Sequence, residues 1–364
     1  MKLQDKLNIL IPIMSLGRSG GIRVLSELAN NWILMGHSVS IVTFYESNAP
    51  YFPTNADVIW VDINGNKVVS NKPDYILSHS VHKRIVALYR FLRRNSENFD
   101  VVFANHNLTV WPVWLGSKST NFYYIQAYEV GLLPNNSVKN CIINIVAYFS
   151  YFLPLHKIVN AEIYKDYKNI HTENVIFPGL DLSIFYPKTT KIFQKDKQFV
   201  VGCIGRLEEL KGTDDVLEAV KILHRKNYDI KFKVAFNPVN YDRYELLSPD
   251  GDNNLADFYR DLDVLVAPCH VQLGAVHYPV IEAMSCKTTV ITTGYYPATN
   301  ENAYIVPIKS PEAIAETIIS ILNNYEQAIY KTEKAYKAIQ QFNWKIVSSK
   351  FIDVFNDEIK RIKK

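Results

Sequence analysis

The chain has 364 residues, more than one average domain needs, and this length suits two domains of ordinary size. Hydrophobic residues make up 48% of it and charged residues 21%, a composition that excludes a disordered chain. The net charge of +4 argues against a dedicated nucleic-acid-binding protein. The four cysteines are scattered without a C-x-x-C pair, which favours reduced thiols in a cytoplasmic protein.

The first predicted strand, residues 7–12, leads into a glycine-containing loop and a helix over residues 22–29. Gly20 and Gly21 end this loop. Glycines there let the backbone approach an anion at the helix N-terminus, but any tight turn between a strand and a helix also uses glycine. The loop is not the G-x-G-x-x-G fingerprint of dinucleotide-binding proteins. Anion binding and a simple turn both remain open.

Residues 81–94 predict a basic amphipathic helix. Its expected apolar stripe consists of Val81, Ile85, Leu88 and Leu92, and its basic face includes Lys83, Arg90 and Arg94. A solvated surface on a helix that packs on the core is one interpretation. Docking of the basic face on anionic lipid headgroups is the other.

Two candidate catalytic residues follow predicted strands of the first half. The buried strand at residues 99–106 ends at His106, and Glu129 follows the strand at residues 122–126. Residues at the C-terminal edge of a parallel sheet face the ligand-binding crevice. His106 suits a hydrogen bond to a sugar or acceptor hydroxyl, with a structural histidine as the alternative. Glu129 suits contact with an acceptor hydroxyl or removal of its proton.

The apolar run at residues 141–155 is too short to cross a membrane, because a spanning helix needs about 20 residues. Pro154 also interrupts it. We expect a buried helix, with a helix that lies in the plane of the membrane interface as the alternative.

The second half begins with a strand at residues 199–204, and Arg206 and Lys211 stand five positions apart in the loop that follows. This spacing lets two cations converge on one diphosphate, with Arg as a fork and Lys as a point charge. No D-x-D metal motif is predicted in a donor-site loop. Asp261 and Asp263 have the right spacing, but Asp263 opens a strand.

A strand–loop–helix–strand unit spans residues 263–292. Its loop, residues 269–277, lies at the C-terminal edge of a parallel sheet, where ligands of open α/β sheets bind. Pro279 suits the first turn of the helix. Glu282 then falls within the first turns, where a carboxylate can accept hydrogen bonds from ribose hydroxyls.

These segments resemble the signature of the family-4 retaining glycosyltransferases with the GT-B fold. The residues of the second half that match are Gly205-Arg206, Lys211-Gly212, Asp263, Pro268, Glu282-Ala283-Met284, Val290-Ile291-Thr292-Thr293 and Glu301-Asn302. The first half matches at Gly20-Gly21, at the G-H-x-V strand start beginning with Gly36, at the strand ending in His106 and over residues 175–187.

The resemblance implies an α/β chain with two Rossmann-like domains, a cleft between them and a C-terminal helix that crosses back to the first domain. Residues 1–187 would form the acceptor domain. Residues 188–345 would form the nucleotide-sugar donor domain, with residues 188–197 as the linker. Residues 346–364 would form the returning helix, and Phe185 and Tyr186 would pack at the interdomain face.

By the same resemblance, Arg206, Lys211, Gly20 and Gly21 would bind the donor diphosphate and Glu282 the donor ribose. The residues expected at the donor sugar are Gly274, His277 and Tyr278. Family members have a glutamate at the sugar-contacting position where this chain has Gly274. His270, Gln272 or His277 are the alternatives for that contact.

The implied function is transfer of a hexosyl or deoxyhexosyl group from a nucleotide diphosphosugar to a hydroxyl, with retention of anomeric configuration. The expected acceptor is a glycan, linked to a lipid carrier, in polysaccharide biosynthesis at the cell surface. No metal or other cofactor is expected. The resemblance places the protein in the cytoplasm or peripherally on the inner face of the cytoplasmic membrane, with 81–94 as the membrane contact.

Two other functions remain open. Gly274 in place of the glutamate is compatible with a non-catalytic nucleotide-sugar or glycan-binding protein. A GT-B nucleotide-sugar epimerase is the second alternative, and it would turn over without an acceptor.

Overall fold

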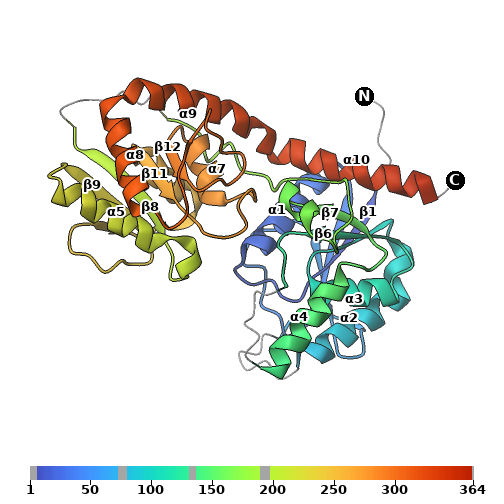
Figure 1. Ribbon diagram of the computed structural model, residues 1–364. Helices are drawn as coiled ribbons and strands as arrows, with labels where there is room; N and C mark the ends of the chain where they lie inside the picture. The colour runs from blue at the N-terminus through green and yellow to red at the C-terminus, as the bar shows by residue number, and fades with distance from the viewer. Residues whose placement is uncertain (1–5, 73–79, 131–136, 189–196, 363–364) are drawn as a thin grey trace. The chain divides into compact units, whose positions relative to one another are not determined.

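The computed structural model describes residues 6–72, 80–130, 137–188 and 197–362, and it divides into two compact units. The first unit joins Met1–Gly179 to Trp344–Lys364, and the second is Leu180–Asn343. Each unit has its own sheet with helices packed against it (Figure 1). The predicted α/β fold of two Rossmann-like units is confirmed.

The division falls after Gly179, whereas the sequence analysis places the boundary after Pro187. Residues 180–187 belong to the second unit because they pack there. Arg260 donates from Nε to the carbonyl oxygen of Tyr186 at 2.7 Å, and its guanidinium lies over the Tyr186 ring. Phe185, expected at an interdomain face, is instead fully buried among residues of the second unit. Positions 189–196 of the predicted linker lie outside the described residues.

The first sheet has the strand order β4-β3-β2-β1-β5-β6-β7 and is parallel except for the β3–β4 pair. Its strands are β1 (Asn8–Pro12), β2 (Ser38–Phe44), β3 (Asp57–Val61), β4 (Lys67–Val68), β5 (Val101–Ala104), β6 (Thr120–Ile125) and β7 (His156–Val159). The helices of this unit are α1 (Gly20–Leu34), α2 (Val81–Asn95), η1 (Ser96–Asn98), α3 (Asn107–Gly116), α4 (Val138–Ser150), η2 (Glu162–Asp166) and α10 (Trp344–Ile362). The chain runs outward from β1 and returns to β5, so the order reverses between these two neighbours.

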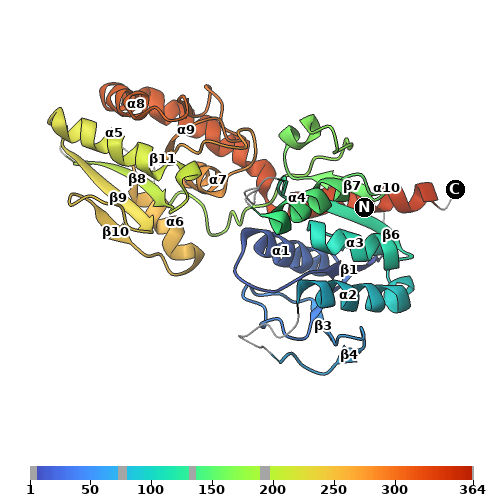
Figure 2. The same cartoon turned by 60° about the horizontal axis from the view of Figure 1, so that its bottom comes forward.

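Helices α4 and α10 lie on opposite faces of this sheet, as the alternation of side chains along β6 shows. Phe122 and Tyr124 face α10, where their rings lie 4.6 Å from Phe355 and 5.0 Å from Phe351. Tyr123, between them, stacks on Tyr151 just after α4 at 5.8 Å. Helices α2, α3 and α4 follow one another along the α4 side (Figures 1 and 2).

Helix α2 confirms the predicted helix and two of the four residues of its predicted apolar stripe, Leu88 and Leu92. Val81 is 51% exposed, and the residues that face the core are Arg84, Ala87, Leu88, Phe91 and Leu92. Arg84 is buried because its Nη2 pairs with Oε2 of Glu46 at 3.2 Å. A buried charge is tolerated when it has such a partner.

Helix α4 corrects the expectation of a buried helix at residues 141–155. Its buried residues are Asn144, Ala147 and Ser150, which are small or polar. Its large apolar residues face outward, and they include Ile142, Ile145 and Phe149.

The second sheet has the order β10-β9-β8-β11-β12-β13 and is parallel throughout. Its strands are β8 (Phe199–Gly205), β9 (Ile230–Phe236), β10 (Glu245–Leu247), β11 (Val264–Ala267), β12 (Thr289–Thr292) and β13 (Tyr304–Ile305). The helices are η3 (Glu209–Lys211), α5 (Thr213–Arg225), α6 (Gly251–Asp261), α7 (Tyr278–Ser285), α8 (Pro311–Asn323), α9 (Tyr325–Ile339) and η4 (Gln340–Phe342). The chain runs outward from β8 and returns to β11. The order therefore reverses between β8 and β11.

Within the described residues, none of the helices combines the length and the apolar composition that a membrane crossing requires.

Replacing Phe351 with Ala removes a buried ring that contacts Trp32, Phe103 and Tyr124. We expect the free energy of unfolding of the first unit to fall by about 3–5 kcal/mol. The control Ile346→Ala, at a 45% exposed position of the same helix, should change it by less than about 0.5 kcal/mol. All tryptophans of the chain lie in the first unit, so their fluorescence during urea unfolding reports on this unit. Equal effects of the two variants would contradict the packing of α10.

Candidate active site

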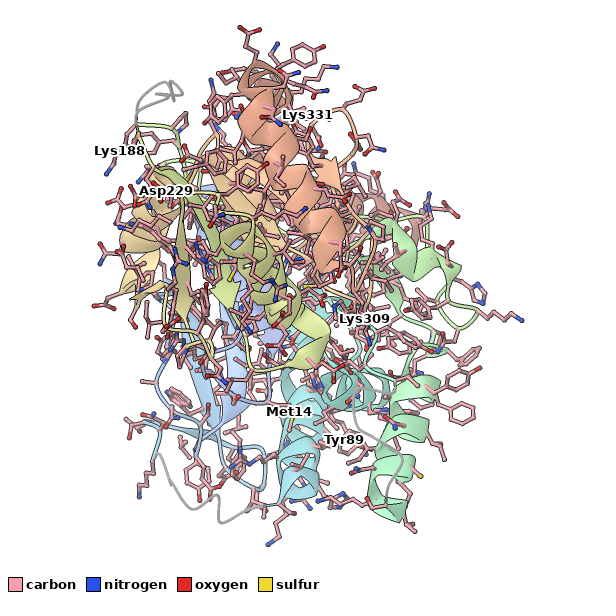
Figure 3. The ribbon with its side chains drawn as sticks, turned by 60° about the vertical axis from the view of Figure 1, so that its left-hand side comes forward. Met14, Tyr89, Lys188, Asp229, Lys309 and Lys331 are labelled. Carbon is pink, nitrogen blue, oxygen red and sulfur yellow. The ribbon has the colours of Figure 1, made fainter. Side chains whose placement is uncertain are left out.

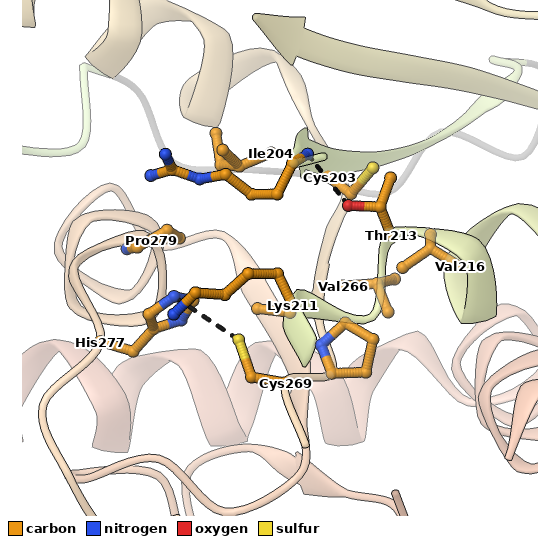
Figure 4. Close-up of a pocket in the computed structure, with 12 residues that line it drawn as sticks. Cys203, Ile204, Lys211, Thr213, Val216, Val266, Cys269, His277 and Pro279 are labelled. Atoms are coloured by element: carbon orange, nitrogen blue, oxygen red, sulfur yellow. Dashed lines mark hydrogen bonds between the residues drawn. The ribbon is translucent and has the colours of Figure 1, made fainter. Parts of the chain in front are cut away.

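A pocket of the second unit lies at the C-terminal ends of β8 and β11, where the strand order reverses (Figure 4). Ligands of open α/β sheets bind at such a reversal. The loop after β8 contributes Arg206 and Lys211 to this donor pocket, and the loop after β11 contributes Cys269 and His277. Folding therefore brings both predicted diphosphate ligands of this unit to one place.

The loop between β8 and α5 is fixed by its contacts. Gly212 has a φ of +70°, and a Cβ atom there would lie 2.1 Å from the carbonyl oxygen of Pro268. Only glycine fits such a position. The next residue, Thr213, accepts at Oγ1 a hydrogen bond of 3.0 Å from the backbone N–H of Arg206. These contacts hold the segment from Arg206 to Lys211 beside the loop that follows β11.

The donor pocket has an excess of positive charge. No ion pair within the described residues involves Arg206 or Lys211. Burial, together with smaller effects of Lys211 and Arg206, lowers the pKa of His277 to about 3. Burial raises the pKa of the Cys269 thiol, and the same two cations oppose that rise. An anionic ligand would neutralise this charge.

His277 is neutral at physiological pH and lines the donor pocket. Its Nε2 lies 3.7 Å from Sγ of Cys269, and the side chain of Lys211 reaches towards both residues (Figure 4). Its Nδ1 is buried without a hydrogen-bond partner in the described part of the chain. A buried nitrogen without a hydrogen-bond partner favours the binding of a ligand that forms a hydrogen bond with it.

His270 and Gln272, the other candidates for contact with the donor sugar, lie outside the lining of the donor pocket. Nε2 of His270 lies 2.6 Å from Oδ2 of Asp215, and this contact ties the loop after β11 to α5. Neither His270 nor Gln272 lines the donor pocket, so His277 is the one of the three alternatives that does.

Gly274 and Tyr278 also stand outside the lining of the donor pocket. Gly274 has a φ of +88° and donates from its N–H to the carbonyl oxygen of Gly294 at 2.8 Å. A glutamate at this position would strain the backbone, which gives a physical reason for its absence. Tyr278 is the first residue of α7 and is half-buried. Their predicted roles at the donor sugar stay predictions.

Glu282 is in α7, as the sequence predicts, but only 3% of its surface is exposed. Its Oε2 accepts a hydrogen bond of 2.8 Å from the hydroxyl of Tyr259. It is not among the residues that line the donor pocket. Ribose binding by Glu282 therefore stays a prediction that needs a hydroxyl to reach this buried carboxylate.

In the first unit, His106 and Glu129 come together at the C-terminal ends of β5 and β6. Nε2 of His106 lies 3.6 Å from Oε1 of Glu129. Nδ1 of His106 accepts from the N–H of Leu108, so the proton of the neutral ring is assigned to Nε2, which faces the carboxyl group. Burial lowers the pKa of His106, against a hydrogen bond with Asn107 that raises it.

The carboxyl group of Glu129 has a strongly raised pKa. Burial raises its pKa to about 7, and the hydrogen bond that its Oε2 accepts from the Asn107 amide at 3.1 Å acts in the opposite direction. Its backbone N–H donates to the hydroxyl of Tyr151 at 2.9 Å. A carboxyl group with a pKa near neutrality can both take up and release a proton.

Gly20 and Gly21 form the N-terminus of α1, which follows β1. The hydroxyl of Ser19 caps the helix by accepting from the Ile22 amide. A Cβ atom on Gly21 would lie 3.3 Å from Nε2 of Gln126, whereas one on Gly20 would meet nothing within 4 Å. Phosphate contact by the pair stays a prediction.

Sequence reasoning missed three residues of these sites. Thr213 and Cys269 line the donor pocket, and Tyr151 supports the backbone of Glu129. The position of Thr213 directly after the K-G pattern was a usable signal. Cys269 and Tyr151 gave none, because a single cysteine or a tyrosine in an apolar run usually belongs to the core.

Residues 198–324 match the family described as glycosyl transferases group 1. The D-inositol 3-phosphate glycosyltransferase of Corynebacterium glutamicum (strain R) is 24% identical over 219 residues, 51% of this chain and 52% of that protein. The capsular polysaccharide biosynthesis glycosyltransferase CapM of Staphylococcus aureus is 27% identical over 192 residues, 46% of this chain and 50% of that protein. Residues 198–324 of this chain are thus similar to the group 1 glycosyltransferases. The chain spans about half the length of the curated relatives it matches.

Solved structures extend the similarity of fold to nearly the whole chain. Sucrose-phosphate synthase from Thermosynechococcus elongatus aligns with a TM-score of 0.75 at 15% identity, over 98% of this chain and 100% of that one. Anabaena Alr3699/HepE, in complex with UDP and glucose, aligns with a TM-score of 0.69 at 14% identity, over 96% and 99%. The two-domain GT-B fold expected from the sequence is confirmed.

The raised pKa of Glu129 predicts a pH-dependent stability. Between the ordinary value of 4.5 and about 7 the native state holds a proton that the unfolded chain has lost, so the free energy of unfolding falls as the pH rises. Glu129→Gln removes this dependence. We expect the variant to gain up to about 3 kcal/mol relative to wild type between pH 5 and pH 8. Urea unfolding at both pH values tests this, and an equal difference at each would contradict the assigned pKa.

Proposed function

We propose that this protein transfers a hexosyl or deoxyhexosyl group from a nucleotide diphosphosugar to a hydroxyl group and retains the anomeric configuration. The observation that supports this most strongly is the donor pocket, in which Arg206 and Lys211 lie at the reversal point of a parallel sheet without carboxylate partners among the described residues. Two unpaired cations at such a place suit a diphosphate.

The chemistry of the transfer explains why these cations are needed. The acceptor oxygen forms a bond to the anomeric carbon, and the bond from that carbon to the β-phosphate oxygen breaks. The nucleoside diphosphate leaves with the bonding electrons, and its phosphate oxygen takes the acceptor proton. Negative charge therefore grows on the diphosphate in the transition state, where Arg206 and Lys211 stabilise it without a metal ion.

Within this proposal, the remaining donor contacts follow the sequence analysis. Glu282 binds the ribose, and the segment from Gly274 to Tyr278 binds the sugar. His277 is the residue of that segment with the best support, because its buried Nδ1 faces no partner among the described residues. Gly20 and Gly21 contribute backbone contacts to the phosphates. The structure of Anabaena HepE with UDP and glucose makes a uridine nucleotide a reasonable first donor to try.

The first unit binds the acceptor in this proposal, and His106 and Glu129 contact its reacting hydroxyl. Glu129 accepts a hydrogen bond from the hydroxyl when ionised, which orients the oxygen for attack. Its raised pKa means that the ionised form, and hence the rate, increases as the pH rises through about 7.

We place the reaction in cell-surface polysaccharide synthesis, on a lipid-linked glycan at the inner face of the cytoplasmic membrane. The similarity to CapM supports this setting. The basic helix at residues 81–94 contributes charge for a peripheral membrane contact. Arg90 and Arg94, however, also donate to the loop at residues 63–66, so part of this charge has a structural use.

Lys211→Ala should weaken the binding of the matching nucleoside diphosphate by about 10- to 100-fold, because a charged contact to phosphate is lost. Thermal-shift titrations with UDP, GDP, dTDP and ADP, with and without EDTA, test this. The matched control is Lys226→Ala, at the opposite end of α5 from the donor pocket, which should bind like wild type. A metal requirement or equal losses in both variants would contradict the proposed diphosphate site.

Glu129→Gln should lower the turnover of sugar transfer by about 10²-fold or more while leaving nucleotide affinity unchanged. Release of nucleoside diphosphate in the presence of lipid-linked acceptor measures the rate. Wild-type binding of nucleotide without any release on adding acceptor would instead favour the non-catalytic binding protein. Isomerisation of the donor sugar without acceptor would favour the epimerase.

A further inference from the structure

Helix α4 has its apolar and polar faces reversed relative to an ordinary surface helix. The residues that face its own unit are Asn144, Ala147 and Ser150, which are small or polar. The residues that face away are large and apolar: Val138 (77% exposed), Ile142 (55%), Ile145 (55%), Phe149 (53%) and Phe152 (50%). A surface helix of a water-soluble protein normally has the opposite arrangement.

The four of them that lie in the helix form one continuous stripe, because they follow one another at intervals of four, three and four positions, and Phe152 extends the stripe just beyond the end of the helix. Tyr148, 39% exposed, widens it. We call this stripe with Tyr148 the α4 apolar face. Figures 1 and 2 show α3 along one side of the helix, and Figure 3 shows side chains of α4 projecting away from its neighbours. Clustered apolar surface of this kind marks a place where a protein meets an apolar partner.

We infer that the α4 apolar face docks on an anionic lipid bilayer, with the helix lying in the plane of the interface. Helix α4 has 13 residues, which at 1.5 Å per residue is too short to cross the hydrocarbon core. Aromatic and aliphatic residues together on one face are typical of helices that rest at the boundary between headgroups and acyl chains.

The charge around the helix favours a bilayer with acidic headgroups. Apart from Arg84, which is buried and paired with Glu46, residues 81–160 contain seven Lys and Arg and three Asp and Glu, an excess of four positive charges that equals the net charge of +4 of the whole chain. Helix α4 itself has Lys139 in its first turn and no acidic residue. Basic residues beside an apolar face bind the negative surface of such a membrane.

The same charge argues against a second copy of this chain as the partner. A two-fold dimer places the same patch of both copies face to face. Two regions with this excess of positive charge would then repel each other. Helix α2 adds charge to the docking surface but little apolar area, because Leu88, Phe91 and Leu92 are in the core, although Val81 is exposed.

This inference extends the proposed function. Its consequence for the acceptor rests on that function. Tyr151 follows the last residue of α4, and its hydroxyl accepts a hydrogen bond from the backbone N–H of Glu129 at 2.9 Å. A bilayer bound at α4 would therefore lie close to the carboxylate that we propose contacts the acceptor. That position suits an acceptor whose reacting sugar is held near the membrane by a lipid carrier.

Co-sedimentation of the full chain with vesicles tests the inference. One set contains phosphatidylcholine alone and the other phosphatidylcholine with phosphatidylglycerol. We expect binding to the acidic vesicles that weakens with salt. Ile145→Asn/Phe149→Ser should weaken it about tenfold or more, because two exposed side chains lose their contact with the acyl region. The matched control, Ile346→Asn/Ile362→Asn, changes two exposed isoleucines of α10, on the opposite face of the sheet, and should bind like wild type.

Three results would overturn the inference. The first is no binding of the wild type to acidic vesicles, and the second is equal losses in the two double variants. The third is a dimer of the lipid-free protein, measured by light scattering, that Ile145→Asn/Phe149→Ser dissociates. Nucleoside diphosphate binding by the second unit is measured on every variant. It separates failure of docking from failure of the proposed donor site. Tryptophan fluorescence during urea unfolding reports the folding of the first unit, and Val138→Asn, at a 77% exposed position, replaces the double variant if that one does not fold.

Discussion

The arrangement of the second unit depends on holding two cations, for which the described part of the chain supplies no carboxylate partner, at the reversal point of its sheet. Arg206 is exposed and Lys211 is half-buried, and like charges that line one pocket repel each other. The chain holds them with Gly212, which fits against the carbonyl oxygen of Pro268, and with Thr213, which accepts from the Arg206 amide. The depressed pKa of His277 results mainly from burial, and the same two charges add to it. A diphosphate would relieve this repulsion. The electrostatics of the unliganded pocket therefore favour ligand binding.

The first unit has a different electrostatic character, because its candidate group is a buried carboxyl rather than a cation. Glu129 and His106 stand after adjacent strands, and both have pKa values shifted by burial towards the neutral form. Near neutral pH the contact at 3.6 Å therefore joins a neutral imidazole to a carboxyl that is partly protonated, which is a weak interaction rather than a full ion pair. Such a pair can accommodate an incoming hydroxyl between its members at low cost. The link from Glu129 through Tyr151 to the end of α4 connects this cluster to the surface that we infer meets the membrane.

Much of the fold and part of the candidate site could be predicted from the sequence. Alternation and periodicity located the strands, and the five-residue spacing of Arg206 and Lys211 placed both in one loop. The orientation of α4 could not be predicted, because an apolar stripe does not say which side of a helix faces the protein. Local sequence patterns also could not predict contacts between residues that are far apart in the sequence. His270 was a candidate sugar ligand until the fold placed it against Asp215, and Glu282 was expected to be open to ribose but is covered and bonded to Tyr259. The boundary after Pro187 was displaced because Tyr186 packs on Arg260, a residue 74 positions away.

A crystal structure of the protein with a bound nucleoside diphosphate would test the central claim most directly. UDP is the first nucleotide to use, with GDP, dTDP and ADP if it does not bind, and the crystals should be grown with EDTA. The account predicts that phosphate oxygens lie within hydrogen-bond distance of Arg206 and Lys211, with no metal between the phosphates and the protein. It also predicts that Nδ1 of His277 gains a partner from the ligand or from an ordered water beside it. A nucleotide bound elsewhere, or a diphosphate held through a metal ion while Arg206 and Lys211 point away, would contradict the account.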